Sequence, residues 1–223
     1  MRRRSVLLLL VIAIVFAAVL SYPYLGLDSA SSRIPVRNGL QYSVLVTHIF
    51  AATVALVLGP LQFMPKIRAR KRIHRIIGGT YLLAGVLPSA LAAIPVAMWS
   101  GQILTQISLT VAAVLWLITG ALAYRAARRR DFAAHRAWMM RNYALTFLAV
   151  TSRILTPLLL VTEALLGGAG SGPVAQHVTS VIPIGQTLGW IVDLIVVEIL
   201  LRRTRRVRFR PGSGRTVDQV AKP

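Results

Sequence analysis

Long apolar runs recur along the chain and are separated by short polar or basic segments. Each run is about twenty residues or longer, which is enough for a helix rising about 1.5 Å per residue to cross a bilayer core. The pattern predicts an all-α polytopic membrane bundle, residues 1–210, with six transmembrane helices at about residues 5–27, 40–63, 75–99, 103–124, 135–166 and 181–201. The tail, 211–223, is rich in Gly, Ser and charge and is expected to be disordered.

The first run has two interpretations. It follows three arginines and could be a cleaved signal peptide with residues 29–32 as a processing zone. Its apolar character reaches Leu27, which is long enough to span, so we favour an uncleaved first helix. With either interpretation, the second helix enters the membrane from the outside.

Composition and charge agree with a membrane protein. The chain is 56% hydrophobic, with a mean hydropathy of +0.66 and a net charge of +20. Its basic residues gather at residues 2–4, 66–75, 125–141 and 202–210, whereas the alternate connections contain few or none. By the positive-inside rule, both termini are cytoplasmic in a multi-pass protein of a bacterial plasma membrane. The expected partner is the bilayer, with anionic headgroups on the cytoplasmic side, and charge confined to helix ends argues against nucleic acid.

Cysteine is absent, which excludes disulfides, thiolate metal sites and cysteine-ligated iron–sulfur clusters. Any redox role would need a bound cofactor. The chain also lacks a phosphate-binding loop, a Gly-x-Ser-x-Gly elbow, a His-Glu-x-x-His motif and a Rossmann fingerprint, so no motif indicates an enzyme.

One face of the helix at 40–63 consists of small residues with a histidine at its outer end. Its members at helical spacing are His48, Ala52, Ala55, Gly59 and Gln62. Such a flat face fits either close packing of another helix or a planar cofactor.

The helix at 135–166 carries a polar stripe. His135, Asn142, Thr146 and Arg153 share one face, which must point into the bundle. An arginine near the middle of a membrane is costly unless it is paired, so an acid at the same depth is expected.

Depth along the helices suggests that acid. Arg153 lies about 20 Å, Asp193 about 18 Å and His48 about 12 Å below the outer surface. We therefore predict a buried cluster of Arg153, Asp193 and His48. It would be either an ion pair that fixes helix register or a ligand or proton site.

Two histidines at equal depth on different helices are what a six-coordinate haem b requires. His74 and His135, at cytoplasmic helix ends, satisfy this condition and would be the metal ligands if haem is bound. The face that offers room beside His74 comprises Gly78, Tyr81 and Gly85. His48 and His177 form a second possible pair on the outer side. The alternative is that His74 and His135 belong to basic clusters that contact lipid headgroups.

The combined motifs resemble a family of bacterial predicted membrane proteins, domain of unknown function 2306, over roughly residues 40–201. The resemblance rests on His48 with Gly59-Pro60-Leu61-Gln62-Phe63, His74-Arg75-x-x-Gly78-x-x-Tyr81, His135-x-x-Trp138-Met139-x-Arg141-Asn142-x-Ala144-Leu145-Thr146, and a last helix with Asp193 and Glu198. It implies a multi-helix membrane fold and no settled activity.

The leading functional hypothesis is a small membrane protein that holds haem or another ligand for electron or proton transfer. Its ligand-binding residues would come from His48, His74, Tyr81, His135, Asn142, Arg153 and Asp193. The alternatives are a small-solute transporter with a midplane site at Arg153 and Asp193, and a non-catalytic subunit that assembles with a membrane partner or with copies of itself.

Overall fold

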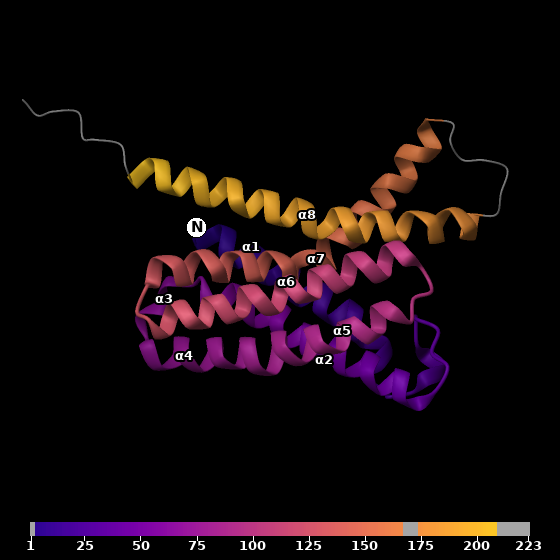
Figure 1. The fold of residues 1–223 in the computed structure, drawn as a ribbon, viewed down its shortest axis with the longest axis horizontal. Helices are drawn as coiled ribbons and strands as arrows, with labels where there is room; N and C mark the ends of the chain where they lie inside the picture. Colours follow the sequence, from indigo (N-terminus) through magenta and orange to yellow (C-terminus); the bar gives the residue numbers. More distant parts are fainter. Residues whose placement is uncertain (1–2, 167–173, 209–223) are drawn as a thin grey trace, which may run out of the picture.

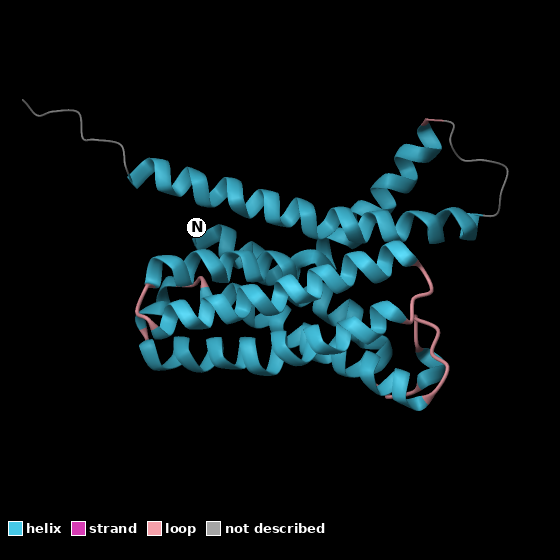
Figure 2. Cartoon of the chain, in the orientation of Figure 1, coloured by secondary structure: helices cyan, strands magenta, loops and turns pink. Residues whose placement is uncertain are grey.

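The computed structural model describes residues 3–166 and 174–208, and side chains for 4–166 and 180–204. In these ranges, every regular element is helical (Figures 1 and 2). The α-helices are α1 (Arg3–Ser21), α2 (Gly39–Gln62), α3 (Pro65–Ala69), α4 (Lys71–Thr80), α5 (Leu87–Met98), α6 (Ile103–Arg128), α7 (Phe132–Leu165) and α8 (Val174–Arg208). The predicted disordered tail, 211–223, lies outside the described residues.

Six transmembrane helices were predicted, and the described residues contain six helices long and apolar enough to cross a membrane. α7 and α8 are longer than predicted, at 34 and 35 residues, or about 50 Å each. α8 continues through the polar sequence at both of its ends, and α7 begins three residues before its predicted start, because a helix does not have to stop where its apolar stretch does. The backbone of His177 therefore lies on α8, although the helix was predicted to begin only at residue 181, and its side chain is outside the described set.

The third span is not a continuous α-helix. Between α4 and α5, the turn η3 (Tyr81–Val86) is π-helical. Pro88, which follows it, has no backbone N–H to donate, which favours such a local change in the hydrogen-bond pattern. Tyr81 begins the π turn and is fully buried.

The long helices run side by side along the long axis of the molecule (Figure 1). We call one end the basic end; it carries residues 66–75 and the α6–α7 connection at 129–131. We call the opposite end the loop end; it carries residues 22–38 and 99–102. α8 ends at the basic end (Figure 1). Both termini were predicted to lie on this side of the membrane.

Small residues allow close approach of the helices. A Cβ placed on Gly85 would lie 2.9 Å from the backbone N of Ala55, so α2 packs directly against the π turn. A Cβ placed on Gly59 would overlap the Tyr143 ring. Of the two explanations for the small face of α2, helix packing is therefore the one that the structure shows at Ala55 and Gly59.

Candidate functional site

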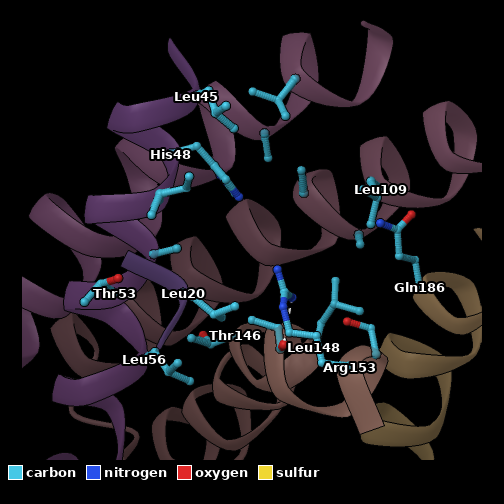
Figure 3. A pocket seen from close by; sticks show the side chains of 18 of the residues that line it. Leu20, Leu45, His48, Thr53, Leu56, Leu109, Thr146, Leu148, Arg153 and Gln186 are labelled. Carbon is cyan, nitrogen blue, oxygen red and sulfur yellow. Dashed lines mark hydrogen bonds between the residues drawn. The ribbon is translucent and has the colours of Figure 1, made fainter. Parts of the chain in front are cut away.

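A cavity of about 350 Å³ lies toward the loop end of the bundle, since residues of the connection 22–38 are part of its lining. Figure 3 shows this cavity from close by. It is lined by residues of α1, α2, α5, α6, α7 and α8 and by the connection 22–38. Its walls are mainly leucine and alanine, and its volume falls in the range of about 300–1,000 Å³ typical of small-molecule sites. The cavity is therefore the strongest candidate for a ligand site in the described part of the chain.

His48 enters this cavity from α2. Its Nδ1 lies 2.9 Å from the carbonyl oxygen of Ser89 and 3.0 Å from the Ser89 hydroxyl, which also donates to the His48 carbonyl at 3.1 Å. Ser89 is fully buried on α5. The α2–α5 contact therefore fixes the orientation of the imidazole ring.

Two arginines line the same space. Arg153 reaches in from α7 (Figure 3), and Arg33 comes from the connection at the loop end. Arg153 Nη1 donates to the carbonyl of Ala149, 2.8 Å away on its own helix. No Asp or Glu is among the lining residues, and the two charged residues of the lining are both positive. The cavity is thus apolar and cationic.

A buried hydrogen-bond network supports one wall of the cavity. Trp116 and Thr146 line the wall, and Trp116 Nε1 donates to Thr146 Oγ1 at 3.0 Å. Beneath them, the Tyr81 hydroxyl lies 2.9 Å from Thr146 Oγ1 and donates to Asn142 Oδ1 at 2.6 Å. Asn142 Nδ2 donates to the Trp116 carbonyl at 2.7 Å and to Thr119 Oγ1 at 2.9 Å. Tyr81 and Asn142, predicted to bind ligand, bond instead to other protein groups here.

The predicted ion pair between Arg153 and Asp193 is absent among the described side chains. Asp193 Oδ1 accepts a 2.8 Å hydrogen bond from Thr151, and its Oδ2 is buried without a hydrogen-bond partner in the described part of the chain. Asp193 is also not among the residues that line the cavity. Thr151 and Arg153 are two residues apart on α7, so their side chains point about 200° apart around the helix. The prediction compared only the depths of Arg153 and Asp193 along their helices. It did not take into account the direction in which each side chain points around the helix axis.

His74 and His135 meet at the basic end, as their equal depth predicted. Their ring centroids are 6.4 Å apart, with the planes at 86°. His135 Nδ1 lies 2.9 Å from the Ala123 carbonyl, whereas His74 Nδ1 is buried without a hydrogen-bond partner among the described residues. The three histidines therefore lie at two heights in the bundle, as predicted from sequence. His48 lies toward the loop end, and His74 and His135 lie at the basic end.

The face expected to offer room beside His74 is filled by protein. A Cβ on Gly78 would lie 3.1 Å from Gln62 Oε1, and Gly85 packs on Ala55. The hydroxyl of Tyr81, the remaining member of that face, lies in the buried network. The available room is at the loop-end cavity instead.

Sequence reasoning missed several residues around these sites. No sequence pattern singled out Ser89. The only indication for Arg33 was that it is an arginine in a connection with few basic residues. The ion pair between Arg141 Nη2 and Glu198 Oε2, at 2.8 Å, joins α7 to α8, and the Arg141 guanidinium lies 4.8 Å from the Trp138 ring centroid. The sequence contains these opposite charges on its last two helices. It does not show that the side of α7 with Arg141 packs against the side of α8 with Glu198.

Comparison with known proteins gives one clear result. The family model described as predicted membrane protein, DUF2306, matches residues 45–201. Neither the curated proteins nor the solved structures contain a match. The matched segment includes α7, most of α2 and the membrane-spanning part of α8 up to Leu201. The chain therefore belongs to the DUF2306 family of predicted membrane proteins.

Proposed function

We propose that this multi-pass membrane protein binds an organic carboxylate with an apolar body in the loop-end cavity. The observation that carries the proposal is the pairing of Arg33 and Arg153 in an apolar cavity with no acidic lining residue. Apolar walls suit the body of such a ligand, and a guanidinium suits its carboxylate, which it can bind through two parallel hydrogen bonds.

Arg153 carries its positive charge within the membrane-spanning helix α7. A cation within a membrane span is costly, and such residues usually have a counter-charge. Among the described residues, no carboxylate lies within ion-pair distance of Arg153, and the other charged residue of the lining, Arg33, is also positive. Both residues are exposed. A bound carboxylate would place a negative charge beside the two arginines and offset the repulsion between like charges.

Sidedness gives this ligand a direction of approach. If the basic end is cytoplasmic, as the positive-inside rule predicts for a bacterial plasma membrane, the cavity lies in the outer half of the bilayer. The ligand would then arrive from outside the cell or from the outer leaflet, which suits uptake or sensing. At the opposite side, the arginines and lysines of residues 66–75 would contact anionic lipid headgroups.

Haem is a second candidate, favoured by the meeting of His74 and His135. Its fit is poorer, because the adjoining face at Gly78, Tyr81 and Gly85 is filled by protein. If haem binds, protein purified from haem-supplemented cells will show a Soret absorption band that disappears in His74→Ala. Colourless, folded protein from such cells would exclude this candidate.

The carboxylate proposal can be tested with octanoate as the probe and Arg153→Gln as the variant. We expect octanoate to raise the unfolding temperature of the full chain in detergent, because a ligand that binds only the folded state stabilises it. The variant should bind octanoate about tenfold more weakly or worse, which corresponds to about 1.4 kcal/mol. Binding is measured by titration calorimetry.

Two controls isolate the charge. 1-Octanol presents a similar apolar chain without the carboxylate and should stabilise the protein less. Arg37→Gln removes an arginine from the same connection as Arg33, but outside the cavity lining, and should bind octanoate like the wild type. Equal affinity in Arg153→Gln and the wild type, or no octanoate binding by the wild type, would contradict the proposal.

A further inference from the structure

We infer that His48 is the proton-exchanging residue of the cavity and that the carboxylate is bound with uptake of a proton by the His48 imidazole. This inference rests on the proposed function and adds to it the protonation state of the ligand. It starts from the contact between His48 and Ser89, since that contact determines which ring nitrogen can exchange a proton.

The Ser89 contact assigns the tautomer of His48. A backbone carbonyl only accepts hydrogen bonds, so the Nδ1 atom at 2.9 Å from Ser89 O carries a proton and donates it. The Ser89 hydroxyl has its own acceptor, the His48 carbonyl. In the neutral ring, the lone pair is therefore on Nε2, the nitrogen that does not contact Ser89.

The ring of His48 extends into the cavity toward Arg153 (Figure 3). The ionisable groups that face this space are Arg153 from α7, Arg33 from the loop-end connection and Tyr24 from the turn η1 (Tyr22–Tyr24). α5 and α6 contribute no ionisable residue to the lining, and α8 contributes only Gln186. Both charges in the lining are positive. Positive charges around an imidazole favour its neutral form, which can accept a proton.

A carboxylic acid has the complementary chemistry. When the neutral acid enters, its O–H bond breaks, an N–H bond forms at His48 Nε2, and the bonding pair of the O–H bond stays on the carboxylate. The resulting carboxylate lies among an imidazolium and two guanidinium groups, and the transfer itself changes no net charge. Entry as the neutral acid also avoids moving a bare anion past the apolar walls, which is the costly alternative.

The experiment is titration calorimetry of the full chain in detergent with octanoate, at one pH near neutrality, in buffers with different protonation enthalpies. The dependence of the measured enthalpy on the buffer gives the number of protons taken up per octanoate. We expect a value approaching one for the wild type and near zero for His48→Gln. Asp193→Asn is the matched control, because it removes a buried carboxyl group outside the cavity and should leave the proton uptake unchanged.

A second measurement does not depend on the folding of a variant. If one proton is taken up, the Kd of the wild type for octanoate should rise about tenfold per pH unit where the free His48 is neutral. Octanoate binding without proton uptake, with a Kd independent of pH, would overturn the inference and leave the carboxylate site standing. Uptake retained by folded His48→Gln would also overturn it. Absence of octanoate binding would instead refute the proposed function itself.

Discussion

Replacing Asn142 with leucine is expected to lower the free energy of unfolding by about 2–3 kcal/mol. The side chain is fully buried and makes three hydrogen bonds, to the Trp116 carbonyl, the Thr119 hydroxyl and the Tyr81 hydroxyl. Leucine has a similar size but satisfies none of these partners. A hydrogen bond inside a membrane protein contributes about 0.6 kcal/mol on average, and polar groups left buried without partners add to the loss.

Two further variants separate this effect from a change in packing. Asn142→Asp keeps an acceptor for Tyr81 but places an oxygen against the Trp116 carbonyl, so it should destabilise about as much as leucine. Tyr81→Phe removes a single hydroxyl and should cost about 1 kcal/mol. Unfolding is followed by titration with a denaturing detergent. If Asn142→Leu and Asn142→Asp both unfold like the wild type, the network contributes no stability.

Replacing Gly59 with alanine should also destabilise the bundle, by about 1–3 kcal/mol, because it overpacks the contact between α2 and α7. The new Cβ would occupy the position of the Tyr143 ring. That ring has little freedom to move, since it is buried between Phe63 and Phe147 and its hydroxyl donates to the Leu56 carbonyl. Thermal unfolding in detergent measures the loss.

Gly79→Ala is the matched control for this substitution. It also adds one methyl group to a helical glycine, but no atom lies within 4 Å of the new Cβ. Since alanine favours a helix by up to about 1 kcal/mol over glycine, the control should shift the unfolding temperature upward. In a Tyr143→Ala background, Gly59→Ala should lose its penalty. A downward shift for Gly59→Ala that persists without the Tyr143 ring would refute this explanation.

The six spans were predictable from sequence, because length and hydropathy alone decide which segments can cross a bilayer. The two layers of histidines were also accessible, since depth follows from counting residues at a fixed rise. Rotation around each helix axis was not accessible in this way. It depends on which faces pack together, and for that reason Asp193 was included in the predicted cluster with Arg153 and His48, whereas the cavity lining joins these two residues with Arg33.

Arg33 shows a second limit of sequence reasoning. It belongs to an irregular connection, residues 22–38, in which no periodicity relates one position to the next. Only the folded chain brings this connection over the cavity beside α7. Arg153 had a signal of its own, because a charge within an apolar run is costly enough to indicate a special environment.

The π turn at Tyr81–Val86 sets the phase between the two layers of the molecule. A π turn accommodates one more residue than an α turn, and one residue corresponds to about 100° of rotation around the helix axis. Without this extra residue, Ser89 would be turned away from His48 while His74 kept its place beside His135. One inserted residue thus allows a single span to contact His135 through His74 and His48 through Ser89, at two different heights in the bundle.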